Sequence, residues 1–246
     1  MITTYRLLTT AGLFLTLSKG AFSQALNDSS YIAAASQNLT NFYLSQQRES
    51  SSIFNGRYYF DHISLHDNEH TFFGNGQFVQ GSITSEGYSY NDLDVAYDIV
   101  RDELIVIGPD KKSKVIVNPK FVESFFVQGH TFINLKTDTE SEEQIPSGYY
   151  DLLHKGPSVL LAKRQKKVHE SVNQFDVKRN ASVNDRYYLL RDSVFRQVKT
   201  KGDLVNLFGT NRSQIQQYIK TNKLNFKKEK ERSILRVVGY FDSIKN

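Results

Sequence analysis

A series of short runs rich in β-branched and aromatic residues dominates the chain from Ile53 onward. Neighbouring runs are separated by turn-forming pairs such as Asn55-Gly56, Gly108-Pro109 and Asn118-Pro119. The runs recur at intervals of roughly ten residues, which is typical of strands joined by tight turns. The clearest of them cover residues 77–83, 93–99, 103–107, 122–127, 131–135 and 159–163. We therefore expect a β-rich (α+β) fold built on an antiparallel β meander, as a sandwich or an open barrel.

The pattern changes towards the end of the chain, where apolar residues recur at helical spacing. The clearest apolar stripe consists of Ile234, Val237, Val238, Phe241 and Ile244. We divide the chain accordingly into a polar N-terminal segment (residues 24–52), a β domain (53–167) and a basic, mainly helical C-terminal region (168–246).

Residues 1–23 have the features of a cleavable secretory signal peptide. Arg6 is followed by an apolar run, and Ala21-Phe22-Ser23 then fits the small-x-small cleavage pattern. The apolar run, of roughly eleven residues, is shorter than the ~20 that a membrane-spanning helix needs, and no later stretch meets that requirement. A buried N-terminal helix is the alternative, but it would give no reason for the cleavage pattern. We expect an exported protein of the periplasm or cell surface, whose mature chain begins at Gln24 and has no transmembrane segment.

The charge is divided unevenly along the mature chain. Residues 24–153 contain 8 Lys and Arg against 18 Asp and Glu, a net formal charge of −10, whereas residues 154–246 contain 21 against 8, a net of +13. Two explanations remain open. The tail from Lys155 to Lys245 either docks on the acidic half, or it binds an anionic partner such as lipid or surface polymer. DNA is not an expected partner, because an export signal directs the chain away from the genome.

Three histidines, His62, His66 and His70, fall at intervals of four residues. The segment predicts a hairpin with its turn at residues 67–69, which would bring His66 and His70 together across the turn. Imidazoles in that arrangement are potential ligands for a divalent metal. The simpler interpretation is an exposed polar hairpin that carries histidines by chance.

A second cluster contains the carboxylates of Asp92, Asp94 and Asp98, which strand alternation places on one face. A pair of facing carboxylates is what a glycoside hydrolase requires, so these residues are candidate binding or acid–base groups. A solvated sheet face explains them without any chemistry. The sequence contains no Gly-x-Ser-x-Gly, His-Glu-x-x-His or phosphate-binding glycine loop, and it predicts no cofactor.

Three segments are distinctive: Phe54-Asn55-Gly56-Arg57-Tyr58-Tyr59, Asp102-Glu103-Leu104-Ile105-Val106 and Tyr218-Ile219-Lys220-x-Asn222-Lys223-Leu224. Together they resemble uncharacterised exported proteins of Bacteroidota. They are turn and core positions, so the resemblance implies an envelope location and transfers no activity. Together with the many Tyr and Phe residues on short strands, it favours a non-enzymatic envelope protein that binds a partner protein or a surface glycan. The alternative function is hydrolysis of an envelope polymer by the strand-face carboxylates.

Overall fold

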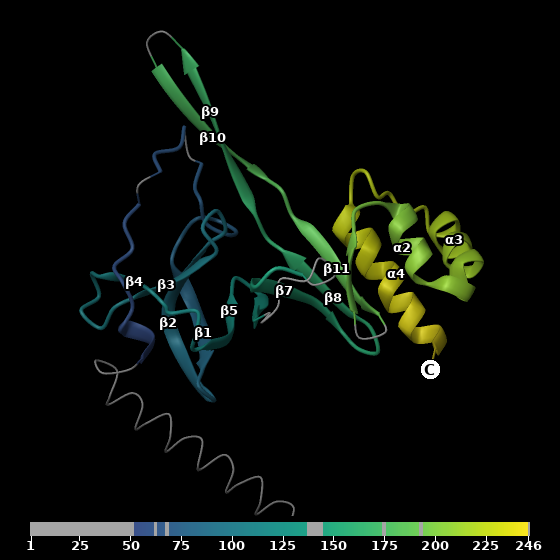
Figure 1. Cartoon of the computed structure of the whole chain (residues 1–246), viewed down its shortest axis with the longest axis horizontal. Helices are drawn as coiled ribbons and strands as arrows, with labels where there is room; N and C mark the ends of the chain where they lie inside the picture. Colours follow the sequence, from purple (N-terminus) through teal and green to yellow (C-terminus); the bar gives the residue numbers. More distant parts are fainter. Residues whose placement is uncertain are drawn as a thin grey trace, which may run out of the picture. The chain divides into compact units, whose positions relative to one another are not determined.

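A computed structural model of the chain describes residues 52–61, 63–66, 69–136, 145–173, 176–191 and 194–245 (Figure 1). All of them belong to one compact unit, Gln47–Asn246. The proposed signal peptide and nearly all of the polar N-terminal segment lie outside the described residues. No helix in the described ranges is both long and apolar enough to cross a membrane.

Ten strands form a single antiparallel sheet in the order β12-β11-β8-β7-β6-β5-β1-β2-β3-β4. They are β1 (Val79–Ser85), β2 (Tyr88–Asp98), β3 (Glu103–Ile107), β4 (Lys114–Ile116), β5 (Val122–Val127), β6 (His130–Leu135), β7 (Gly148–Lys155), β8 (Val159–Lys163), β11 (Arg186–Arg191) and β12 (Val194–Val198). The sheet is open, because each end strand, β4 or β12, has only one neighbour in it. The expected β-rich antiparallel fold with C-terminal helices is therefore confirmed.

The β1–β7 part of the sheet curls around an aromatic core. Tyr97 of β2 packs edge-on against Phe132 of β6 and Tyr149 of β7, with ring centroids 4.9 and 5.7 Å apart. Because β1, β5 and β6 separate β2 from β7 in the sheet, these contacts require strong curvature. The alternation of Leu93, Val95 and Tyr97 with more polar residues in the sequence places one apolar face of β2 in this core. The curl brings the turn after β2 close to β7 and β8.

The segment before β1 forms no regular strand in its described residues. It begins with a short 3₁₀ turn, η2 (Ser52–Phe54), and makes two isolated bridges, Tyr58 with Val115 and Phe72 with Asp98. Tyr59 and Phe72 cover the face of the sheet opposite the aromatic core, where they pack with other buried residues of β2, β3 and β4. The turn of the hairpin predicted around His66 and His70 falls at residues 67 and 68, outside the described residues, so this hairpin stays a prediction; next to it the backbone N–H of Glu69 donates to the carbonyl of His66 at 3.3 Å.

Strands β9 (Lys166–Asn173) and β10 (Asp176–Val183) form a separate two-stranded ribbon between β8 and β11 (Figure 1). The segment before β1 also pairs with the ribbon, because the backbone N–H of His66 donates to the carbonyl of Arg179 at 2.8 Å. Strands therefore continue to Val198, and the region 168–246 begins with strands rather than with helices. The strands of the ribbon could not be predicted from its polar, Lys-rich sequence, because the ribbon buries neither of its faces.

Three helices, α2 (Lys201–Leu207), α3 (Arg212–Thr221) and α4 (Lys230–Lys245), follow the last strand, with a 3₁₀ turn, η3 (Gly209–Asn211), between the first two. A capping box starts α2, in which Thr200 and Asp203 each accept a backbone N–H of the other residue. The helices cover β8, β11 and β12 through a second apolar core. The helical residues of this core include Ile215, Ile219, Ile234, Val237, Val238 and Phe241. The tail therefore docks through the apolar stripes seen in the sequence, but mainly on strands of its own basic half.

Arg164 joins the ribbon, the sheet and the helices. Its guanidinium donates to Asp151 of β7, to Asp185 at the base of the ribbon and to Glu231 of α4, with distances of 2.5 to 2.8 Å for the closest contact to each. His130 of β6 makes a further 2.8 Å contact with Asp151. Both Arg164 and Asp151 are buried. This ionic cluster fixes the position of β8, and therefore of Lys163 at the end of that strand.

Candidate functional site

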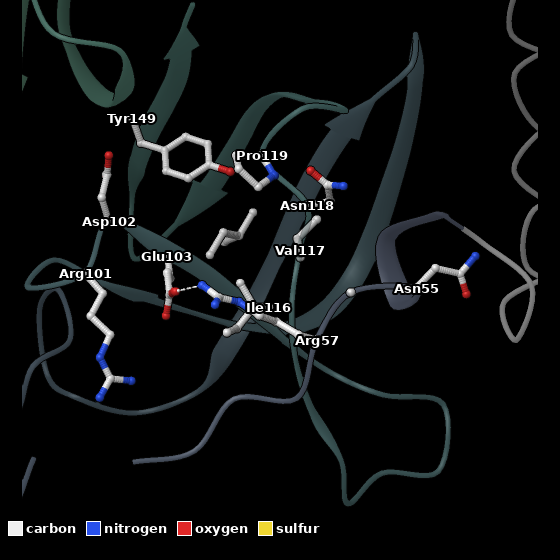
Figure 2. Close-up of a pocket in the computed structure, with 12 residues that line it drawn as sticks. Asn55, Arg57, Arg101, Asp102, Glu103, Ile116, Val117, Asn118, Pro119 and Tyr149 are labelled. Carbon is white, nitrogen blue, oxygen red and sulfur yellow. Dashed lines mark hydrogen bonds and ion pairs between the residues drawn. The ribbon is translucent and has the colours of Figure 1, made fainter. Parts of the chain in front are cut away.

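A pocket of about 480 Å³ lies where the turn after β2 meets the edge strand β4 and the start of β7 (Figure 2). Its volume falls within the range of known small-molecule sites. The residues that line it are Asn55, Gly56, Arg57, Arg101, Asp102, Glu103, Leu104, Ile116, Val117, Asn118, Pro119 and Tyr149. They come from four segments distant in sequence, so the pocket depends on the curl of the sheet.

The turn between β2 and β3 places three charged side chains at the pocket. The carboxylate of Asp98 accepts the backbone N–H groups of Val100 and Arg101, at 2.9 and 3.1 Å, and so fixes the start of the turn. Asp102 then adopts a left-handed conformation, with a φ of 61°. The chain reverses there and presents Arg101, Asp102 and Glu103 to the pocket.

The opposite wall is formed by residues 55–57, which lie along the edge of the sheet. The backbone N–H of Ile116 donates to the carbonyl of Arg57 at 2.9 Å. Gly56 makes this close approach possible, because a Cβ at that position would lie 1.8 Å from the carbonyl oxygen of Ile116. Arg57 thereby reaches Glu103 and forms an ion pair with its Oε1 (Figure 2).

Asp102 is held by two buried neighbours. Its Oδ2 accepts a 2.6 Å hydrogen bond from Lys163 Nζ, and its Oδ1 accepts a 2.5 Å bond from the hydroxyl of Tyr97. Burial lowers the pKa of Lys163, although the charge of Asp102 opposes this change. Gly148 leaves room for the pair, since a Cβ there would lie 2.1 Å from Asp102 Oδ2.

Two buried oxygens at the pocket have no hydrogen-bond partner within the described ranges: Tyr149 Oη and Glu103 Oε2. Tyr149 is 2% exposed, and Figure 2 shows its hydroxyl end directed towards Pro119. Burial and the nearby charge of Asp102 raise the pKa of Tyr149, so its hydroxyl is protonated at neutral pH. Buried polar atoms nearly always have a partner, and leaving one without costs about 1–3 kcal/mol. Because both oxygens have almost no accessible surface, a ligand or an ordered water in the pocket would satisfy them after a small shift of the side chains that cover them.

The formal charges that line the pocket balance, because Arg57 and Arg101 face Asp102 and Glu103. Lys163, which pairs with Asp102 behind the wall, leaves a net formal charge of +1 around the site. Arg101 is also engaged elsewhere, because it donates to the carbonyl of Phe60 at 3.1 Å and lies 5.3 Å from the centre of the Tyr59 ring. The lining thus offers both donors and acceptors without a strong net charge.

The structure separates the three aspartates that the sequence grouped. Asp98 is fully buried and accepts hydrogen bonds from Tyr59 and Thr71 at 2.9 and 3.1 Å, so its placement on a solvated face was wrong. Asp94 is partly exposed and pairs with Lys111 and Gln80. Asp92 is exposed, with a φ of 54°, at an irregularity in the pairing of β1 with β2. None of the three lines the pocket.

The histidine site stays a prediction, because His62 lies outside the described residues. Lys166 Nζ lies 3.3 Å from Nδ1 of His70 and donates to the carbonyl of the same residue at 2.7 Å. Burial and this cation lower the pKa of His70. Across the described ranges, no group of three or more His, Asp or Glu side chains is arranged to hold a metal ion.

The sequence pointed to part of the pocket only indirectly. Asp102 and Glu103 stood only among the turn and core positions of the segment 102–106, and not among the candidate site residues. Tyr149 gave no signal of its own, since it lies near the start of a run that looks like an ordinary buried strand. The Lys at the end of the apolar run 159–163 was the one available hint, because a buried lysine needs a partner.

Comparisons of the chain with protein-family models, with curated proteins and with solved structures give no match. The functional argument therefore depends on the geometry of the pocket.

Proposed function

We propose that this chain is an exported, non-enzymatic envelope protein that binds a surface glycan, with one sugar unit in the pocket beside Tyr149. The observation that carries the proposal is the pair of buried oxygens, Tyr149 Oη and Glu103 Oε2, which lack partners among the described residues.

A neutral polyhydroxylated ligand suits the pocket better than a charged one. Sugar hydroxyls both donate and accept hydrogen bonds, so one hydroxyl of a sugar unit can donate to Glu103 Oε2 while another accepts from Tyr149 Oη. Asn118 and Arg57 supply further polar groups on the other walls. Because the charges of the lining balance, a strongly anionic or cationic ligand would gain little there. A partner protein is a weaker candidate, since the feature that calls for a ligand is concave and small.

Export is part of the proposal and is supported by the sequence of residues 1–23. Expression with the intact N-terminus, followed by fractionation and mass spectrometry, tests it. A periplasmic or surface fraction containing a chain that begins at Gln24 is the expected result.

The test of binding compares two neighbouring tyrosines: the hydroxyl of Tyr149 has no partner among the described residues, whereas the hydroxyl of Tyr150 is hydrogen-bonded. Tyr149→Phe removes a hydroxyl without a partner, so it should leave stability equal or slightly higher while weakening glycan binding by about 3- to 10-fold, the value of one hydrogen bond. Tyr150→Phe is the matched control, because the hydroxyl of Tyr150 donates to the carbonyl of Pro146 at 2.6 Å outside the pocket. It should lower stability and leave binding unchanged.

Glycan-array screening and then calorimetry on the best ligand provide the measurement, with thermal melting for stability. Binding that is the same in the Tyr149→Phe variant and the parent would place the ligand elsewhere. Release of new reducing ends from the bound glycan would show a hydrolase instead.

A further inference from the structure

A second, larger groove lies among the C-terminal helices, far in sequence from the candidate glycan pocket. It has a volume of about 920 Å³ and runs between the start of α2 and the end of α3. Its lining residues are Thr200, Lys201, Gln216, Ile219, Lys220, Lys223, Leu224, Asn225, Phe226 and Lys227. We name it the lysine groove.

Four of these ten residues are lysines and none is acidic. Lys201, Lys220, Lys223 and Lys227 are all exposed, and none of them forms an ion pair in the described part of the chain. The carboxylate of Asp203 nearby is already used, because it accepts the backbone N–H groups of Lys199 and Thr200. The cations of the lysine groove are therefore free to meet an anion.

The surroundings strengthen this positive field. From Lys199 to Lys245 the sequence holds 11 Lys and Arg against 4 Asp and Glu, a net formal charge of +7. Two of those four acids are already paired, since buried Asp242 binds Ser158 and His154 while the partly exposed Glu231 binds Arg164. The charge that reaches solvent around the groove is thus strongly positive.

The floor of the groove is apolar and firmly held. Ile219, Leu224 and Phe226 pack on the core beneath the helices, while part of Leu224 and Phe226 remains exposed. The backbone N–H of Leu224 donates to the carbonyl of Ile219 at 3.1 Å, which folds the chain back under the end of α3. The same groove therefore offers ammonium groups at its rim and apolar surface between them.

We propose that the lysine groove docks the protein on an anionic phospholipid surface. Phosphate groups pair with the lysines at the rim, and the glycerol backbone and first acyl carbons contact Leu224 and Phe226. An anionic polysaccharide would match the lysines equally well, but it has no apolar part to cover the floor. This inference goes beyond glycan binding and uses none of the residues of that pocket.

The test compares two triple variants that lose the same charge. Lys220→Gln/Lys223→Gln/Lys227→Gln removes three cations of the groove, whereas Lys112→Gln/Lys167→Gln/Lys178→Gln removes three exposed lysines elsewhere. Co-sedimentation is measured with phosphatidylcholine vesicles that do or do not contain phosphatidylglycerol. The chain from Gln24 onward is used, so that the apolar N-terminal run does not itself bind lipid.

The parent should bind the phosphatidylglycerol vesicles and not the neutral ones, and its binding should fall steeply with salt. The groove variant should lose on the order of 100-fold in binding, from the loss of three lysine contacts with an anionic surface. The control variant should lose much less. Both variants should melt at the temperature of the parent, because all six lysines are exposed.

Two further arms separate lipid from other anions. Short-chain phosphatidylglycerol should bind the parent more tightly than glycerol phosphate does, because only the lipid reaches the apolar floor. Equal losses in the two triple variants would reduce the effect to net charge and overturn the proposal. Binding of an anionic polysaccharide with no binding of phosphatidylglycerol would overturn it as well.

Discussion

Replacing Arg164 by Leu should destabilise the protein strongly, because this side chain is the main partner of a buried carboxylate. Asp151 has 2% of its side chain exposed and, among the described residues, would keep only His130 as a side-chain partner. Removing one member of a buried ion pair costs about 3–5 kcal/mol. Asp185 and Glu231 are 15% and 34% exposed and regain water when the guanidinium is removed. We therefore expect the lower end of that range, about 3 kcal/mol.

Urea unfolding followed by far-UV circular dichroism measures this change, since the chain has no Trp to report by fluorescence. The melting temperature should fall by about 6–12 °C, at 2–4 °C per kcal/mol for a domain of this size. In a double variant, Asp151→Leu should recover much of the loss caused by Arg164→Leu, because no buried charge is then left without its partner. Arg179→Leu is the control, since it breaks an exposed pair with Glu170 and should cost less than about 1 kcal/mol.

The reasoning fails if Arg164→Leu costs no more than the Arg179 control. It also fails if the double variant is as unstable as the sum of its two single substitutions, because the two charges would then not interact.

Two other changes test single features. Gly239→Ala should raise stability by about 0.5–1 kcal/mol, because Gly239 lies inside α4 and an added Cβ would meet no atom within 4 Å; a melting curve that shows no gain would contradict this. Burial and Lys166 lower the pKa of His70, so protonation favours the unfolded chain, and the resulting stability is present above about pH 6.5 and lost as the pH falls below it. Urea titrations between about pH 7.5 and pH 5 should show a smaller loss for His70→Gln than for the parent, and equal losses would exclude this role.

Much of the β fold could be predicted from the sequence because its strands obey a simple rule. In β2 and β8 the side chains that enter the cores are apolar and the strands are bounded by turn residues, so pattern and structure agree. The ribbon was missed because Lys167, Lys178 and their neighbours bury neither face, and without burial a strand has no alternation to recognise. The helical stripe at 234–244 was recognised because the helix buries that stripe in the second core.

The pocket could not be predicted, because it forms only where the curl of the sheet brings distant segments together. Asp102 lies in the turn between β2 and β3, whereas Tyr149 belongs to β7, which is next to neither strand in the sheet, and nothing local in either segment indicates that they meet. For the aspartates of β2 the prediction failed in the opposite way, because it grouped residues that the structure separates. Alternation correctly placed Asp94 and Asp98 on one face, but it could not show that Tyr59 and Thr71 cover the end of that face.

The position of β1 between β2 and β5 sets the order in which this sheet can assemble. Most neighbouring strands are consecutive in the chain, so their hairpins form locally, each within roughly 1–10 μs. The pairing of β1 with β5 must instead bring Ser85 to Val122, although the prior folding of β2, β3 and β4 shortens the loop that remains to be closed. The pairing of β8 with β11 is also between non-consecutive strands, but the local β9–β10 ribbon shortens its loop in the same way, so the sheet consists of two wings joined along the β1–β5 seam. Weakening the buried contact of Ile83 with Phe125 in that seam should slow folding if the seam forms in the transition state. A destabilising substitution within a wing that forms after the transition state should mainly speed unfolding.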